Sequence, residues 1–269
     1  DVAATIENIL PHIDEKKDRR FLDKMLKEHY NKLNHVVEAY TKKAEKMKPI
    51  HPEFVANIID EEAADNAVFT VDTGMCNVWG ARYITPNGKR EQIGSFRHGT
   101  MANALPMAIG AQAANEGRQV ISFSGDGGLS MLMGELLTVK LHNLPVKTFV
   151  FNNSSLGMVK LEMLVQGLPE HETDHEHVDY AAIAEAAGIK HIHIEDPKKA
   201  RKQIREAMDF DGPVLVDMIT DPNALSIPPT LTFEQLLGFS KAATRTVFGG
   251  GVGQMLQLAQ SNLRNIPRP

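Results

Sequence analysis

The chain has 269 residues, of which 42% are hydrophobic, and its 29 Lys and Arg against 34 Asp and Glu give a net charge of −5. This length suffices for one large α/β domain or two small ones, and the mild charge balance gives no general case for a nucleic-acid-binding protein. The single cysteine, Cys76, excludes an intrachain disulfide and suits a reducing cytoplasm. No apolar run approaches the roughly 18 residues that span a bilayer.

The first fifty residues predict helices that cannot form a core by themselves. Residues 1–10 have an acidic start and apolar residues at helical spacing. Residues 15–48 are rich in Lys and Arg, and their apolar positions also recur at helical spacing, at Leu22, Leu26, Leu33, Val37 and Tyr40. A basic amphipathic helix can bind anionic lipid or nucleic acid. A solvated linker of one or two helices is the preferred interpretation.

A domain boundary is predicted near residue 50, between Pro49 and Pro52. After it, short apolar strands alternate with amphipathic helices. The predicted strands are residues 67–71, 120–124, 148–151, 191–194 and 214–219, and the predicted helices are residues 51–62, 102–114, 131–137, 180–188 and 197–208. Such alternation is typical of an α/β fold, a mostly parallel sheet with helices on both faces.

Two polar motifs follow neighbouring strands of that predicted sheet. The turn Gly125-Asp126-Gly127-Gly128 follows one strand, and Asn152-Asn153 follows the next. Parallel strands bring such ends together at the crevice where open α/β sheets bind ligands. Glycines and a helix N-terminus suit a diphosphate, and an Asp and an Asn offer oxygen ligands to Mg²⁺. A lone Gly-Asp-Gly is often only a turn, but the asparagine pair makes that interpretation much weaker.

Together these motifs resemble the signature of thiamine-diphosphate-dependent enzymes. The resemblance implies that Asp126, Asn153 and the main-chain carbonyl of Ser155 bind Mg²⁺, and that Gly127 and Gly128 approach the diphosphate. A second block, residues 94–106, also matches. There Met101 would be the wedge that bends the cofactor, and the carbonyl of Gly99 would meet its aminopyrimidine ring. By the same resemblance, the cofactor-binding residues are Gly74, Met75, Cys76, Gly99, Met101, Gly125, Asp126, Gly127, Gly128, Asn153, Ser155, Leu156, Gly157 and Met158.

Four positions near the predicted cofactor also have a packing interpretation. Cys76 is by default a small packed hydrophobe. Met158 and Val159 form either an apolar wall for a small substrate or ordinary core, at even odds. Trp79 is interpreted as a packing anchor.

Within that family, the motifs look most like the flavin-containing pyruvate oxidases and the pyruvate:quinone dehydrogenase. Acetolactate synthases usually have glycines where this chain has Ala102-Asn103-Ala104. The resemblance implies oxidative decarboxylation of pyruvate to acetate or acetyl phosphate, with FAD as the electron acceptor. The activating glutamate and most of the FAD site would belong to a preceding domain, so no general base is assigned within this chain. The alternatives are an acetolactate-synthase-type carboligase and a non-catalytic cofactor-binding or assembly fragment.

The resemblance also implies a division of the chain. Residues 1–14 would end a flavin-binding domain, 15–50 would be a helical linker, 51–248 the thiamine-diphosphate and Mg²⁺ domain, and 249–269 a C-terminal helical tail. The chain is then expected to be the C-terminal part of a longer polypeptide that forms a homotetramer, and to be inactive alone. Pyruvate would be the substrate, with a quinone and a membrane surface as further expected partners. We expect a cytoplasmic protein or one at the inner face of the cell membrane.

Several remaining features have competing interpretations. The tail places Val252, Met255, Leu256, Ala259 and Leu263 on one helical face; packing on the domain is favoured over membrane contact. His98 is interpreted equally as a general base or as a backbone hydrogen-bond partner. His171, His175 and His177 lie among acidic residues, but an exposed loop is favoured over a metal site. The glycines at 249–253 follow no strand, which excludes a dinucleotide-binding turn.

Overall fold

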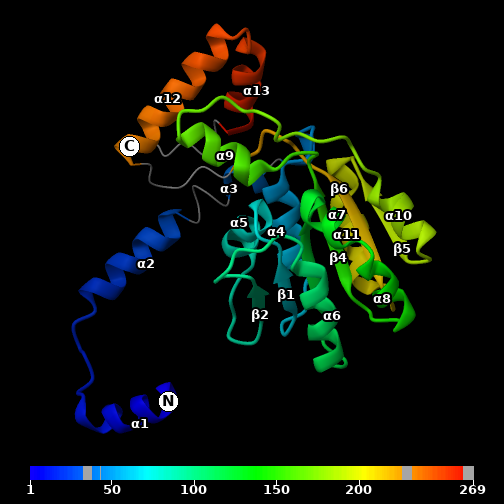
Figure 1. Cartoon of the computed structure of the whole chain (residues 1–269). Coiled ribbons are helices and arrows are strands. Elements are labelled where there is room, and N and C mark those ends of the chain that lie inside the picture. Colours follow the sequence, from blue (N-terminus) through cyan, green and yellow to red (C-terminus); the bar gives the residue numbers. More distant parts are fainter. Residues whose placement is uncertain (33–37, 43, 226–231, 263–269) are drawn as a thin grey trace.

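The computed structural model describes residues 1–32, 38–42, 44–225 and 232–262. In this part of the chain six strands form one parallel sheet in the order β2-β1-β3-β4-β6-β5 (Figure 1). The strands are β1 (Val68–Val71), β2 (Glu91–Gly94), β3 (Val120–Gly125), β4 (Lys147–Asn152), β5 (Lys190–Ile194) and β6 (Val214–Ile219). The predicted α/β class is therefore confirmed.

Helices cover both faces of the sheet. Those of the central domain are α4 (Pro52–Glu62), α5 (Met75–Tyr83), α6 (Ala104–Ala114), α7 (Asp126–Leu132), α8 (Glu135–Leu141), α9 (Gly157–Val165), α10 (Tyr180–Ala186) and α11 (Pro197–Asp209). On one face, residues of α4, α5 and α11 share a buried apolar cluster with the sheet. On the other, residues of α6, α7, α8 and α10 form two further clusters with it.

The two faces of the sheet differ in polarity because side chains alternate along each strand. In β3, Ile121 and Phe123 point into the first cluster. Ser122 and Ser124 alternate with them, and their hydroxyl oxygens lie 3.0 Å apart in the buried interior. A fully buried parallel strand can hold such residues because each hydroxyl group has a hydrogen-bond partner.

Two predicted helix boundaries were wrong. The helix predicted from residue 102 begins at Ala104, because Ala102 has a positive φ of 64° that a helix does not allow. The helix predicted at 131–137 begins at Asp126, directly after the strand, and a break at Gly134 separates α7 from α8. The edge strand β2 was not predicted; its exposed, mixed-polarity residues lack the apolar pattern of a buried strand.

The N-terminal segment lies apart from the sheet in Figure 1. It contains α1 (Val2–Ile9), a 3-10 helix (Leu10–His12) and α2 (Arg20–Lys32), and α1 buries none of its residues. The short helix α3 (Glu38–Thr41) and a 3-10 helix (Ala44–Lys46) then lead into α4. The helical linker expected here is consistent with these elements, while the predicted domain limits at 14, 50 and 248 stay predictions.

The C-terminal helices α12 (Phe233–Phe248) and α13 (Val252–Asn262) pack beside α9. Leu164 of α9, Leu225, Ala242 and Leu258 form their shared apolar cluster. The predicted face of the tail was wrong in detail: Val252, Leu256 and Ala259 are exposed, whereas Met255 packs against the cluster that contains Leu258. The face of α13 that packs against the cluster therefore carries residues 255, 258 and 262, and it lies beside the predicted face.

Three predicted positions lie outside the described residues, namely Leu33, Val37 and Leu263. Among the helices that the structure describes, none combines the length and the hydropathy that a membrane span requires.

Candidate functional site

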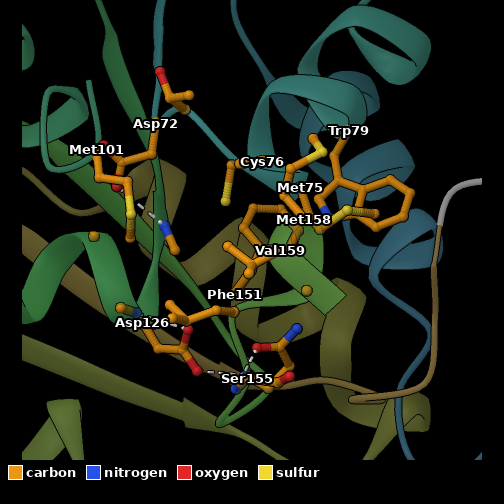
Figure 2. Close-up of a pocket in the computed structure, with 18 of the residues that line it drawn as sticks. Asp72, Met75, Cys76, Trp79, Met101, Asp126, Phe151, Ser155, Met158 and Val159 are labelled. Atoms are coloured by element: carbon orange, nitrogen blue, oxygen red, sulfur yellow. Dashed lines mark hydrogen bonds between the residues drawn. The ribbon is translucent and has the colours of Figure 1, made fainter. Parts of the chain in front are cut away.

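The carboxyl ends of β1, β3 and β4 open onto a cavity of about 300 Å³. All fourteen residues that the sequence assigned to a cofactor site line it, from Gly74 near β1 to Met158 in α9. Figure 2 shows Asp126 and Ser155 on one side, and the apolar side chains of Met75, Met158 and Trp79 on the other. The structure thus brings the assigned residues together, and their binding of a cofactor stays a prediction.

Asp126 is a buried carboxylate at the first residue of α7. Its Oδ1 accepts a hydrogen bond of 2.8 Å from the Gly127 N–H, and its Oδ2 accepts bonds from the N–H groups of Asn153, 2.9 Å, and Ser154, 2.5 Å. Burial raises the pKa of Asp126, while these amide donors and the nearby His175 act in the opposite direction. The side chain therefore ties the two turns together.

The turn after β4 is held in a conformation that few side chains adopt. Ser154 has a positive φ of 53°, and the Asn153 Oδ1 accepts a hydrogen bond of 3.0 Å from the Ser155 N–H. A left-handed residue outside glycine indicates local strain that surrounding structure must maintain. This turn presents the Asn153 amide and the Ser155 residue to the same cavity as Asp126.

The two glycines after Asp126 lie close to side chains of the protein itself, so they have little room for a Cβ even without a ligand. A Cβ on Gly127 would lie 2.8 Å from a methyl carbon of Leu156, and a Cβ on Gly128 would lie 2.3 Å from the Asp72 Oδ2. The sequence argument explained both glycines by the approach of a diphosphate. The structure adds that a larger residue at either position would require Leu156 or Asp72 to move.

Asp72 was not assigned to the site from the sequence, yet it links three loops of the site. Its Oδ1 accepts a hydrogen bond from the Ala104 N–H, 2.9 Å, and its Oδ2 accepts one from the Gly125 N–H, 3.2 Å. Burial raises the pKa of Asp72 to about 6, although these amide donors favour its charged form. A carboxylate at a strand end, two residues before a positive-φ glycine, Gly74, was the available signal.

A buried network of hydrogen bonds supports the turns that carry Asp126 and Asn153. The Tyr180 hydroxyl donates to the Asp126 carbonyl oxygen at 2.7 Å. The Asn152 amide donates to the Asp217 Oδ1 at 3.0 Å, and the Tyr180 N–H donates to the other oxygen of Asp217 at 3.2 Å. Burial raises the pKa of Tyr180 to about 12 and also raises that of Asp217. Sequence reasoning missed this network because its members are far apart in the chain.

Met101, the predicted wedge, lines the cavity, and its contact with a cofactor stays a prediction. The terminal methyl carbon of Met101 would lie 3.6 Å from a Cβ on Gly127, so Met101 and Leu156 approach the same glycine. Ala102, directly after Met101, has the positive φ noted above. Cys76 and Trp79 line the cavity and are nearly buried, and burial raises the pKa of the Cys76 thiol.

The histidines fall into two groups. His98 is exposed and does not line the cavity, so the structure does not bring it to the site as a base. His171 and His177 are exposed, as expected for a surface loop. His175 contradicts that expectation, because its Nε2 is buried and lies 3.6 Å from the Asp126 Oδ2.

The residues that are present fit a Mg²⁺-bound diphosphate. A buried carboxylate, a neighbouring amide oxygen and a main-chain carbonyl are the hard oxygen donors that Mg²⁺ prefers. The cavity has the size and the mixed polar and apolar lining of a small-molecule site. Elsewhere in the described chain, Asp179, His193 and Asp217 have ligand atoms within 4.8 Å of one another, but Asp217 already accepts two hydrogen bonds there.

Comparison with known proteins agrees with this geometry. Residues 72–218 match the family described as thiamine pyrophosphate enzyme, C-terminal TPP binding domain. A Bacillus subtilis protein, YdaP, described as thiamine pyrophosphate-containing, is 34% identical over 97% of this chain. An acetolactate synthase large subunit of Pyropia yezoensis is 33% identical over 73% of the chain, and acetolactate synthase 1 of Zea mays is 32% identical over 63%.

The match covers only part of each relative. The aligned region is 45% of the Bacillus subtilis protein, 34% of the Pyropia yezoensis subunit and 28% of the Zea mays enzyme. The chain thus spans less than half the length of these relatives.

Proposed function

Because the chain belongs to the thiamine pyrophosphate enzymes, through their C-terminal TPP-binding domain, we propose that it is the cofactor-binding part of an enzyme that decarboxylates pyruvate. The observation that carries this proposal is the junction of two turns at Asp126, whose carboxylate is buried between the Gly127 and Asn153 amides. Asp126, the Asn153 amide oxygen and the Ser155 carbonyl would hold Mg²⁺. The N–H-rich turns would orient the diphosphate.

The protein's own contribution is binding, orientation and exclusion of water. When bound, thiamine diphosphate supplies the electron-accepting ring that allows the bond to a 2-keto acid's carboxylate to break. Met101 and Leu156 would fix the bend of the cofactor above Gly127. The apolar side chains of Met75, Met158 and Val159 would exclude water from the reactive end of the cofactor.

For the reaction that follows decarboxylation, a flavin-dependent pyruvate oxidase or pyruvate:quinone oxidoreductase is the first candidate. Its support is the Ala102-Asn103-Ala104 motif after the wedge and the alignment of nearly the whole chain with a relative outside the acetolactate synthases. FAD, a quinone acceptor, a homotetramer and a preceding domain that carries the activating glutamate are parts of this proposal.

A carboligase of the acetolactate synthase type is the second candidate, because two of the relatives described above carry that name. The two reactions differ in product and in electron transfer. Pyruvate-dependent reduction of a dye, with acetate as product, supports the oxidoreductase. Acetolactate formation without dye reduction, in the same preparation, would select the carboligase.

Cofactor binding is tested separately from turnover. Titration calorimetry with thiamine diphosphate, with and without MgCl₂, should show Mg²⁺-dependent binding in the wild type that is lost in Asp126→Ala. Binding that is independent of both Mg²⁺ and Asp126 would refute the proposed site. A chain that binds but does not turn over pyruvate would match the expectation that another domain completes the active site.

A further inference from the structure

The segment that carries His175 is fixed against the turn that carries the predicted metal ligands. The Leu156 N–H donates to the Thr173 carbonyl at 2.8 Å, and the His175 N–H donates to the Ser154 carbonyl at 3.0 Å. Lys160, which is 3% exposed, pairs with Asp174 at 2.8 Å and with Glu170 at 3.0 Å. His175 is therefore placed by backbone hydrogen bonds and by ion pairs of its neighbour Asp174 and of Glu170 with the buried Lys160.

The two ring nitrogens of His175 have different surroundings. Nδ1 lies 3.0 Å from the Glu176 carbonyl oxygen, which can only accept, so Nδ1 carries a hydrogen. Nε2 is buried, has no hydrogen-bond partner among the described residues, and lies 3.6 Å from the Asp126 Oδ2. That separation is longer than a hydrogen bond. In the neutral ring, Nε2 would therefore direct a lone pair into a buried carboxylate site.

A divalent cation is a group that would accept the lone pair of His175 Nε2 beside this carboxylate. Oδ2 already receives two backbone N–H groups, so it does not need His175 as a hydrogen-bond donor. Two donors on one divalent cation, each at about 2.1 Å, lie about 3.0 to 3.5 Å apart at neighbouring coordination positions. The observed 3.6 Å is close to that range.

We propose that His175 is an additional ligand of the metal that Asp126 and Asn153 bind, and that it gives this site a preference for Mn²⁺ or Co²⁺ over Mg²⁺. The inference rests on the proposed function, because it concerns the same metal. Its chemistry follows from donor type: Mg²⁺ is bound almost entirely by oxygen, whereas imidazole nitrogen raises the affinity for first-row transition ions.

The direct test is pulsed electron paramagnetic resonance of Mn²⁺ bound to the full chain with thiamine diphosphate. Wild type should show ¹⁴N coupling from a directly bound imidazole, and His175→Gln should abolish it. Competition of MgCl₂ against MnCl₂ should show the Mn²⁺ preference falling about 10-fold in His175→Gln. The matched control is His177→Gln, two residues away and exposed, which should leave both readouts unchanged.

The outcomes separate this inference from the proposed function. Bound Mn²⁺ without ¹⁴N coupling in the wild type would overturn the ligand role, including the case in which a water molecule lies between His175 and the metal. An unchanged Mn²⁺ preference in His175→Gln would also overturn it. In either case, loss of Mn²⁺ binding in Asp126→Asn would leave the proposed function standing. If the wild type binds no Mn²⁺ at all, both fail together.

Discussion

Two buried carboxyl groups, Asp72 and Asp126, hold the loops of the cavity, and each does so by accepting backbone N–H groups. Asp126 joins the turns after β3 and β4, whereas Asp72 joins the β3 turn to the start of α6. Asp126 is assigned to the metal. Asp72 has no assigned ligand, so its effect on the loops can be measured without the cofactor.

Titration of Asp72 should make stability depend on pH in a defined window. Burial raises its pKa from 3.8 to about 6, so the folded chain holds this proton more tightly than the unfolded chain does. The resulting stabilisation is full below about pH 4 and is lost as pH rises through about 6. Over that window the free energy of unfolding of wild type, relative to Asp72→Asn, should fall by on the order of 3 kcal/mol.

Urea unfolding of both proteins at about pH 4 and about pH 7 measures this difference. Asp126 and Asp217 also have raised pKa values, but they titrate in both proteins and largely cancel. Identical pH dependence in wild type and variant would show that Asp72 does not titrate in this range.

Gly128→Ala should destabilise the chain because the new methyl group meets a carboxylate oxygen. A Cβ there would lie 2.3 Å from the Asp72 Oδ2, so either the α7 backbone or the Asp72 side chain has to move. We expect a loss of about 1 to 3 kcal/mol in the free energy of unfolding. Gly134→Ala is the control: no atom of the described residues lies within 4 Å of its Cβ position. A small cost at 128, equal to that at 134, would contradict the contact.

Residue-level prediction from sequence succeeded where a function requires a short motif. Asp126 and Asn153 follow strands directly, so their convergence needed only the parallel order of two strands. Asp72, Tyr180 and His175 were missed for another reason. Each reaches the site through contacts with residues 28 or more positions away or through the path of a long loop, and neither is encoded in local spacing.

At the scale of elements, α10 acts as a support for α7. Its first residue, Tyr180, is fully buried, and its hydroxyl reaches the Asp126 carbonyl at 2.7 Å. The hydrophobic pattern correctly placed a helix here. It could not show that the Tyr180 hydroxyl donates a hydrogen bond to the turn that carries Asp126, because packing patterns do not report the partner of a buried hydroxyl group.

Tyr180→Phe should therefore weaken metal binding without unfolding the domain. The ring that fills the core remains, and only the hydrogen bond is lost, for a cost of about 0.5 to 1.5 kcal/mol in stability. We expect the affinity for Mg²⁺ with thiamine diphosphate to fall by roughly 3- to 10-fold by calorimetry, about the same free energy. Tyr30→Phe, in the exposed part of α2, serves as the control. Unchanged affinity in Tyr180→Phe would mean that Asp126 is held without this bond.

The C-terminal helices α12 and α13, which form a helical hairpin, are a second element whose packing can be tested. Leu258 of α13 is buried against Leu164 and Leu225, whereas Leu256 is exposed. Leu258→Ala should leave a cavity and cost about 2 to 5 kcal/mol of local stability, seen as faster hydrogen exchange in α12 and α13. Leu256→Ala should change exchange little. Equal effects of the two substitutions would show that the hairpin is not docked as described.

At the scale of the whole molecule, the sequence predicts the fold more accurately than it predicts the boundaries of the helices. Alternating apolar strands and helices predict a parallel sheet, and all five predicted strands are present. The edge strand β2 depends instead on its pairing with β1, and the break between α7 and α8 falls at Met133 and Gly134. The predicted oligomer is likewise a property of surfaces, which the pattern of buried residues does not describe.

The predicted oligomer can be tested at the surface of α7, which begins at Asp126, and of α8. Five large apolar side chains in α7, α8 and their junction are exposed, namely Met131, Leu132, Met133, Leu137 and Leu141. Several large apolar side chains exposed along one pair of helices are a candidate surface for contact with another protein chain. We therefore expect the double substitution of Leu137→Glu and Leu141→Glu to convert an oligomer to a monomer of 29.7 kDa, measured by light scattering after gel filtration. Leu141 is 80% exposed, so the fold itself should tolerate the charge.

The matched control places the same charges on an exposed apolar pair elsewhere. Val252→Glu and Leu256→Glu in α13 add equal charge at side chains that are 50% and 59% exposed, and they should leave the mass unchanged. If the α8 variant stays oligomeric while the α13 variant dissociates, the contact lies at the C-terminal hairpin. A monomeric wild type would contradict self-association of this chain, and the exposed apolar residues of α7 and α8 would then need a different partner for their burial.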